Sequence, residues 1–238
     1  MRIALIGYGK MGKAIEEIAL KRDHAIVLKI DEDNLADFTR ENLSGADVAI
    51  EFTGPHSAFD NVKKAIGWGI PVVCGSTGWI NRLDEINKFC TDKKGSFLYA
   101  SNFSIGVNLF FELNKKLASL MSAHPDYRVI LEETHHTQKK DAPSGTAITL
   151  AGQIIENIPS KKRWVNGDSN NPEEIPIISK RIDPAAGTHI VRYSSPIDDI
   201  EIIHMAHNRL GFASGAVLAA EFIHDKKGIF AMKDVLRF

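Results

Sequence analysis

Short apolar runs alternate with amphipathic segments through the first hundred residues. Met11, Ile15 and Ile18 mark one face of a helix, and residues 58–68 and 81–92 are also expected to be helical. The apolar runs have the length of buried strands and lie at residues 3–6, 25–30, 48–53, 70–74 and 96–100. This alternation predicts a parallel sheet with helices on both faces.

The pattern changes after residue 104. One long amphipathic helix is expected over residues 107–122, where apolar side chains recur at helical spacing: Leu109, Phe110, Leu113, Leu117 and Leu120. The later segments read as a strand at 127–132, a helix at 146–157, a polar stretch at 159–176, and strands at 177–181, 188–194 and 200–204. Because the connections between the last strands are too short for crossovers, we expect antiparallel or mixed pairing.

The last apolar segment, residues 213–222, is rich in glycine and alanine and predicts a closely packed helix. We expect this helix to pack back on the first half of the chain, which would make the first domain discontinuous. The alternative is a helix that belongs to an oligomer interface.

A glycine-rich turn follows the first predicted strand. A helix pattern starts at once, and the next strand ends at Asp31, about 20 residues after the glycines. The turn fits the pattern G-x-G-x-x-G and consists of Gly7, Tyr8, Gly9, Lys10, Met11 and Gly12. This context predicts an α/β, Rossmann-like dinucleotide-binding domain with a parallel sheet, formed by residues 1–103 and 212–238. The alternative is a fold of this type that has lost its cofactor.

Each glycine of the turn has a mechanical role in such a site. Gly7 makes the tight turn, Gly9 lets the backbone approach a pyrophosphate, and Gly12 lets the helix pack on the strand. Asp31 would hold the ribose of the adenosine. Because Glu32 follows it, two carboxylates would repel a 2′-phosphate, so we expect NADH to be preferred over NADPH.

Small or polar residues end three further strands of the predicted parallel sheet. Ligands of such sheets bind beyond the carboxyl ends of the strands, so these residues are candidates for cofactor contacts. They are Phe52 and Thr53, then Gly75, Ser76 and Thr77, and finally Asn102. The alternative for any one of them is an ordinary helix cap.

One connection, residues 133–147, carries an unusual density of reactive groups. It contains His135 and His136, Lys139 and Lys140, and the sequence Ser144-Gly145-Thr146. Ser144 is a good N-cap, so Gly145 and Thr146 would open the following helix with free N–H groups, which bind anions. The connection therefore predicts a carboxylate or phosphate site with proton donors beside it. Its parts taken singly are also typical of solvated surface loops.

Composition limits the partners that the chain can have. The formal net charge is −1, so we expect neither nucleic acid nor an anionic membrane as a partner. Two cysteines, Cys74 and Cys90, are too few for a disulfide framework and are typical of a reducing compartment. No apolar run approaches the roughly 20 residues of a transmembrane helix, and the first strand leaves no room for a signal peptide. We expect a cytoplasmic protein.

The sequence resembles the dihydrodipicolinate reductase (4-hydroxy-tetrahydrodipicolinate reductase) family of lysine and diaminopimelate synthesis. The most specific part is His135-His136-x-x-Lys139-x-Asp141-Ala142-Pro143-Ser144-Gly145-Thr146-Ala147. Similar segments include the glycine turn, residues 75–78 and 102–104, Arg181, and Gly187-Thr188-His189. The resemblance covers nearly the whole chain in the same order.

This resemblance implies an NAD(P)H-dependent reductase of a cyclic, unsaturated dicarboxylate. His135 would be the proton donor and Lys139 a second donor, while the substrate would be bound by His136, Ser144, Gly145 and Thr146. Cofactor contacts would include Ala100, Ser101, Asn102 and Phe103 besides the glycine turn and residues 75–77. The second domain, an α+β domain with a mixed sheet over residues 104–211, would bind substrate and build homotetramers.

Three alternatives remain open from the residues. The protein could be another NAD-dependent oxidoreductase that acts on an amino or keto acid. It could be a cofactor-binding regulator without catalysis. It could also hold a metal at His135, His136, His189, His204 and His207, although the His204-x-x-His207 spacing is not a strong zinc pattern and we expect no metal.

Overall fold

The computed structural model describes residues 1–208 and 210–238. The chain divides into two compact units, the first made of Met1–Ile105 with Leu210–Phe238 and the second of Gly106–Arg209. The first unit holds a parallel sheet and the second a mixed sheet, so the predicted fold class is confirmed. Among the described residues, no helix has the length and apolarity needed to cross a membrane.

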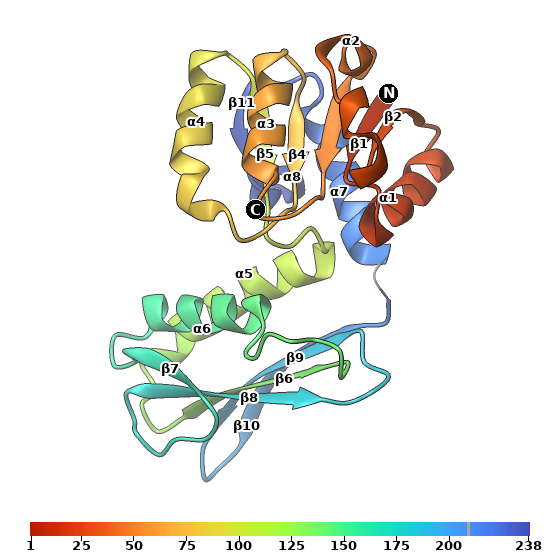
Figure 1. The fold of residues 1–238 in the computed structure, drawn as a ribbon. Coiled ribbons are helices and arrows are strands. Elements are labelled where there is room, and N and C mark those ends of the chain that lie inside the picture. The colour runs from red at the N-terminus through yellow and green to blue at the C-terminus, as the bar shows by residue number, and fades with distance from the viewer. Residues whose placement is uncertain (209) are drawn as a thin grey trace. The chain divides into compact units, whose positions relative to one another are not determined.

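The first unit alternates strands and helices, as the apolar pattern predicts (Figure 1). Its elements are β1 (Arg2–Ile6), α1 (Lys10–Lys21), β2 (Ala25–Ile30), η1 (Glu32–Asp37), α2 (Arg40–Leu43), β3 (Val48–Glu51), α3 (Ala58–Gly67), β4 (Val72–Cys74), η2 (Ile80–Arg82), α4 (Leu83–Asp92), β5 (Ser96–Tyr99), α7 (Leu210–Ile223), β11 (Gly228–Phe230) and α8 (Met232–Leu236). The strands pair in parallel in the order β11-β5-β4-β3-β1-β2.

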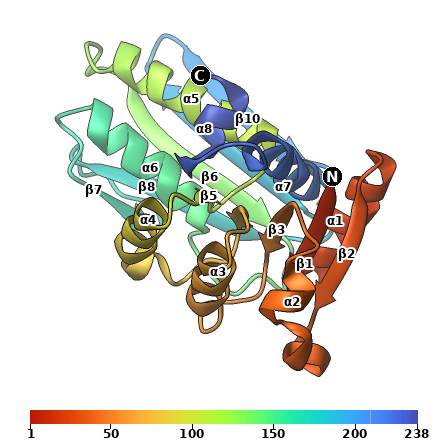
Figure 2. The same ribbon diagram turned by 90° about the horizontal axis from the view of Figure 1, so that it is seen from above.

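Two apolar layers cover the two faces of this sheet. Alternate strand residues point to opposite faces, so Ile3 and Leu5 pack with α1 and α7 while Ala4 and Ile6 pack with α3 and α4. Figure 2 shows α3 and α4 on one side of the strands and α1 and α7 on the other. Strand order reverses between β1 and β3, which makes the carboxyl ends of these strands the place for a ligand.

The chain returns to the first unit at its end. The predicted apolar helix, α7, buries Gly215 and six other small or branched residues against α1 and the sheet. A Cβ on Gly215 would lie 1.8 Å from the carbonyl oxygen of Phe103, so only glycine fits at this crossing. Strand β11 then extends the sheet beyond β5; the apolar pattern gave no prediction for it.

The second unit is a five-stranded sheet with two helices on one face. Its elements are α5 (Ile105–Met121, whose first residue belongs to the first unit), β6 (Arg128–His135), α6 (Gly145–Asn157), β7 (Arg163–Asn166), β8 (Glu174–Arg181), β9 (Gly187–Ser194) and β10 (Asp199–Ala206). The strand order is β10-β9-β6-β8-β7, with antiparallel pairing from β10 to β6 and parallel pairing from β6 to β7. Mixed pairing was expected.

Two local predictions need correction. The polar stretch 159–176 contains β7, a strand so short that a loop of seven residues suffices for parallel pairing with β8. Residues 42–47, expected to be a connection, begin inside α2, whose one turn is capped by Thr39. The long helix α5 is present as predicted. Its leucine stripe, Leu109, Leu113 and Leu120, is 48%, 58% and 57% exposed.

The buried face of α5 is rotated from that leucine stripe. Val107, Phe110 and Ala118 pack against the sheet, and Asn114 is buried with them. The amide of Asn114 donates to the Leu150 carbonyl (3.1 Å) and to Gln153 (2.9 Å), so its donor atoms are satisfied. A buried polar residue paired with another helix is invisible to an apolar periodicity.

Candidate functional site

The glycine turn is shaped by contacts that leave no space for side chains. Gly7 has φ +98°, and a Cβ there would lie 2.2 Å from the Phe52 carbonyl oxygen. A Cβ on Gly12 would lie 2.3 Å from the Gly7 carbonyl oxygen, so Gly12 allows α1 to pack on β1. Gly9, the N-cap of α1, has open space above it and no side-chain cap, which leaves the first N–H groups of α1 available to an anion.

A cleft of about 720 Å³ opens beside this turn, within the first unit. Of the predicted cofactor residues, six line it: Gly7, Tyr8, Gly9, Asp31, Phe52 and Thr53. The Asp31 carboxylate accepts the Glu32 backbone N–H (2.9 Å), so it caps η1 while facing the cleft. The cleft also includes Phe38, Asn61 and Lys64, which the sequence gave no reason to select.

The other predicted cofactor residues lie outside the lining of this cleft. They are Lys10, Met11, Gly12, Gly75, Ser76, Thr77, Ala100, Ser101, Asn102 and Phe103. Phe103 is 2% exposed, and its ring lies against that of Phe52 with centroids 5.6 Å apart and an interplanar angle of 54°. The Ser76 hydroxyl donates to a buried carboxylate, Glu51 (3.1 Å).

The second group of predicted residues gathers at the end of β6. This strand extends to His135, three residues beyond the predicted end, so His135 belongs to the strand and the connection is shorter than expected. Inward-facing positions along β6 are Val129, Leu131, Glu133 and His135, apolar at first and ionisable at the end. That alternation was visible in the sequence and would have identified Glu133.

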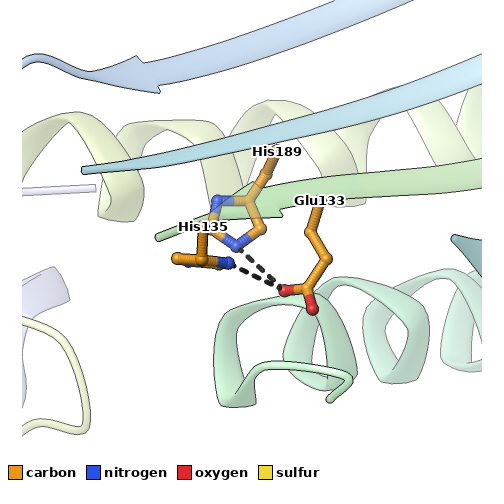
Figure 3. Close-up of side chains that lie close together, drawn as sticks. All are labelled: Glu133, His135 and His189. Carbon is orange, nitrogen blue, oxygen red and sulfur yellow. Dashed lines mark ion pairs between the residues drawn. The ribbon is translucent and has the colours of Figure 1, made fainter. Parts of the chain in front are cut away.

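Glu133 is the centre of this cluster, which Figure 3 draws with its two histidines. The carboxylate is 1% exposed, and both of its oxygens accept the Ser144 backbone N–H at 3.1 Å. One oxygen also accepts from the Arg181 guanidinium (3.1 Å). The other lies 3.4 Å from His135 Nδ1 and 3.8 Å from His189 Nε2.

Burial controls the charge of the two imidazoles. It lowers the pKa of His135 below its usual value, while the Glu133 carboxylate acts in the opposite direction. Burial, followed by the nearby His135, lowers the pKa of His189 to about 3. Burial alone would raise the pKa of Glu133, but hydrogen bonds from Ser144 and Arg181 outweigh it and lower that pKa. The cluster thus holds a carboxylate between two largely neutral imidazoles at neutral pH.

The rest of the connection is fixed around this carboxylate. Arg181 donates to the backbone carbonyls of Lys139 and Asp141, so it ties the connection to β8. The Lys139 ammonium lies 2.8 Å from both oxygens of Asp141. The result is a cationic group held within reach of the His135 end of β6.

Ser144 caps α6 as predicted, with its hydroxyl accepting the Ala147 N–H (3.2 Å) and lying 3.2 Å from His189 Nε2. A Cβ on Gly145 would meet nothing within 4 Å, so the start of α6 is open to a ligand. Thr146 follows on α6, and His136 comes directly after β6. The helix start, the ammonium and the imidazoles suit a small anionic substrate that takes up a proton.

The structure leaves a smaller set of candidate metal ligands than the five predicted histidines. Among the described residues, ligand atoms of Glu133, His135 and His189 lie within 4.8 Å of one another, and His136, His204 and His207 are not part of this group. The Glu133 oxygens already accept two N–H donors, one of them from a cation. The nearest nitrogens of the two imidazoles lie 3.4 Å (His135) and 3.8 Å (His189) from the carboxylate.

Comparison with known proteins gives two family matches. The model described as "Dihydrodipicolinate reductase, N-terminus" matches residues 1–103, and that described as "Dihydrodipicolinate reductase, C-terminus" matches residues 106–236. Together they cover both units.

Named relatives agree with these matches. The chain is 52% identical to 4-hydroxy-tetrahydrodipicolinate reductase of Christiangramia forsetii over 99% of this chain and 98% of that protein. It is 36% identical to the enzyme of the same name from Methanosarcina acetivorans, over 98% of this chain and 88% of that protein. A dipicolinate-bound dihydrodipicolinate reductase from a Paenisporosarcina species has a similar structure, with a TM-score of 0.76, 26% identity and 97% coverage of both chains.

Proposed function

The chain belongs to the dihydrodipicolinate reductase family, and we propose that it reduces a cyclic, unsaturated dicarboxylate, 4-hydroxy-tetrahydrodipicolinate or dihydrodipicolinate, to tetrahydrodipicolinate. It is an oxidoreductase of lysine and diaminopimelate biosynthesis, as the resemblance of the sequence implied. The first unit would carry the nicotinamide cofactor and the second the substrate.

The first unit fits a dinucleotide. The open backbone at Gly9, the uncapped start of α1 and the position of Asp31 in the same cleft are what a pyrophosphate and a ribose require. A nicotinamide cofactor bound there supplies the hydride. The residues proposed to hold it are the glycine turn, Asp31, Phe52 and Thr53, with the backbone of 75–77 and 100–103 nearer the nicotinamide.

We propose that NADH is preferred over NADPH. Asp31 and Glu32 both line the cleft and would repel a 2′-phosphate, while Lys64, which lines it too, is the cation through which NADPH would be accepted. The ratio of kcat/KM for the two cofactors tests this. A clear advantage of NADPH would contradict it.

The residues at the end of β6 would provide the proton. Hydride addition to a conjugated imine leaves electron density on the ring that must be protonated, and an imidazole or an ammonium can do this. His135 is the proposed donor and Lys139 the second, with the Glu133 carboxylate favouring the protonated imidazole. The substrate carboxylates would bind the start of α6 at Ser144, Gly145 and Thr146, with His136.

The observation that carries this proposal is the meeting of His135, Lys139 and the start of α6 around Glu133. The test is NADH oxidation with the substrate made in place from pyruvate and aspartate semialdehyde by a separate synthase. Loss of absorbance should depend on the synthase and fall sharply in a Lys139→Ala variant. Tight NADH binding without turnover would point to another acid substrate or to a non-catalytic sensor.

We propose a homotetramer assembled through the second unit. Ile200, Ile203 and Met205 on the edge strand β10 are 38%, 54% and 57% exposed, and α5 adds its leucine stripe. Light scattering after gel filtration would give the mass, and Ile203→Glu should lower it. A cytoplasmic location, also proposed, would be checked by cell fractionation.

A further inference from the structure

Glu51 is a fully buried acid that the proposed reaction does not use. It is the last residue of β3, between Ile6 of β1 and Cys74 of β4, and its exposed fraction is 0%. No lysine, arginine or histidine in the described ranges 1–208 and 210–238 forms an ion pair with it. A carboxyl group buried at a ligand cleft without a cation needs another reason to be there.

Neutral donors surround this carboxyl group instead. Its oxygens accept the Thr53 backbone N–H (3.0 Å), the Thr53 hydroxyl and the Ser76 hydroxyl (3.1 Å). The Cys74 thiol donates from the other side (2.9 Å), and burial, with Glu51 nearby, raises the pKa of that thiol so that it remains a donor. Every hydrogen bond at Glu51 therefore points inward.

The hydrogen bonds that are directed toward Glu51 continue outward, through Thr53, to residues of the cleft wall. The Thr53 hydroxyl gives its only proton to Glu51, so its lone pairs accept from Ser57 (2.9 Å) and from the Asn61 amide (3.3 Å). Thr53, Ser57 and Asn61 all line the cleft that contains Asp31. Because its proton goes to Thr53, the Ser57 hydroxyl offers a ligand only its lone pairs, while the Asn61 amide offers its carbonyl oxygen and its second N–H.

The other residues of the cleft indicate which part of the dinucleotide would meet this wall. Asp31 marks the ribose of the adenosine, and Phe38 and Lys64 add a ring and an apolar stem to the same cleft. The base attached to that ribose therefore lies within reach of Ser57 and Asn61. Adenine offers an exocyclic amino group, a donor, to acceptors at this position.

We propose that Glu51 is a positioning residue that, through Thr53, keeps the Ser57 hydroxyl as an acceptor and thereby selects adenine by its amino group. This rests on the proposed use of a nicotinamide–adenine dinucleotide. The donors of Thr53 and Ser76 all meet one oxygen of Glu51, Oε1, so a glutamine whose carbonyl oxygen takes that position keeps their hydrogen bonds. Leucine removes the acceptor, and the Thr53 hydroxyl then donates to Ser57 instead. The Ser57 hydroxyl would then present its proton to the base, and the preference for adenine would be lost.

The test compares NADH with nicotinamide hypoxanthine dinucleotide, whose base carries an oxygen in place of the amino group. Direct titration of the full chain, by calorimetry and by fluorescence of the reduced nicotinamide, gives both dissociation constants without substrate. One well-placed hydrogen bond predicts a preference for NADH of about tenfold in the wild type. Glu51→Leu should reduce that ratio to about twofold or less, whereas Glu51→Gln should keep it.

Two further variants distinguish a positioning role of Glu51 from a general loss of folded structure. Cys74→Ser keeps a donor to Glu51 on the side away from Thr53 and should keep the wild-type ratio. The double variant Ser57→Ala with Asn61→Ala removes the acceptors while Glu51 stays, so it should lose the ratio even where Glu51→Leu does not fold.

The inference is overturned if the wild type binds both dinucleotides equally, or if Glu51→Leu weakens both without changing their ratio. Wild-type protein that binds neither dinucleotide overturns this inference and the proposed function together. Wild-type binding of both with equal affinity leaves the proposed function standing.

Discussion

Glu51 in the first unit and Glu133 in the second are both buried acids at the carboxyl end of a strand. Neutral donors surround Glu51, namely two hydroxyls, a thiol and a backbone N–H. Glu133 has a guanidinium, a backbone N–H and two imidazoles. The two clusters therefore have similar burial and different partners.

The partners decide what each acid can do. A ring of neutral donors fixes the direction of hydrogen bonds but stores no charge that could be passed to a ligand. An acid beside imidazoles shifts their pKa values and so influences when they carry a proton. We expect Glu51 to affect recognition of the cofactor and Glu133 to affect proton transfer, and four variants test this division.

The largest effect is expected from His135→Ala. Loss of the proposed proton donor should reduce kcat by about 10²–10⁴-fold, because proton transfer by a positioned side chain contributes a factor of that size. The dissociation constant for NADH should stay within about twofold of the wild type. Steady-state kinetics and a direct titration measure the two quantities. A parallel loss of NADH affinity would contradict the separation of the two clusters.

His189 gives the next effect, on stability against pH. The unfolded chain binds a proton at this residue below the ordinary value of 6.5, whereas the folded chain binds it only near 3. Between these values the unfolded state holds more protons, so the free energy of unfolding falls as the pH falls, by up to about 1.4 kcal/mol per pH unit.

His189→Gln should remove that contribution. Urea unfolding at pH values from 7 down to 4 would show a shallower decline for the variant than for the wild type. Parallel declines would show that His189 is protonated in the folded protein, which contradicts its assignment as a neutral member of the Glu133 cluster.

Glu133→Gln should shift the pH dependence of the reaction. The carboxylate opposes the effect of burial on the pKa of His135, so its removal lowers that pKa further. The falling limb of kcat/KM should then move to lower pH by about one unit, with roughly tenfold lower activity at neutral pH.

Glu132→Gln is the matched control, because this neighbouring side chain pairs with Lys180 instead (2.6 Å). Glu132→Gln should leave the falling limb of the kcat/KM profile at its wild-type pH. An equal shift in both variants would mean that overall charge, and not the contact with His135, sets the profile.

The smallest effect is expected from Asp31→Asn in the first unit. Removing one of the two carboxylates that face a 2′-phosphate should raise the NADPH to NADH ratio of kcat/KM by about five- to tenfold. The pH profile should not change, because the proton donor lies in the other unit. A shifted profile would link the two clusters.

Much of this organisation could be predicted from the residues in order. Period-two and period-3.6 patterns gave the strands and helices of the first unit, and the glycine turn with Asp31 indicated the dinucleotide cleft. Ser144 was predicted as an N-cap and is one. Such features depend on neighbours within a few residues, so they are encoded locally.

Other features required the tertiary structure. The leucine spacing of α5 predicted a helix, but only the structure shows its buried face, where Asn114 meets partners on α6 that lie 36 and 39 residues away. The sequence did not show that Glu51 would meet Ser76, or that Glu133 would meet Arg181 and His189. Strand pairing brings these groups together although the partners lie 25, 48 and 56 residues apart in the chain.

The sequence by itself determined the family, the order of the elements and the residue types available for chemistry. Only the tertiary structure decided which acid is surrounded by neutral hydroxyl and thiol donors and which by a guanidinium and two imidazoles. The physical reason is that a hydrogen bond or a pKa depends on distances of a few ångströms, and sheet register sets those distances between residues far apart in the chain.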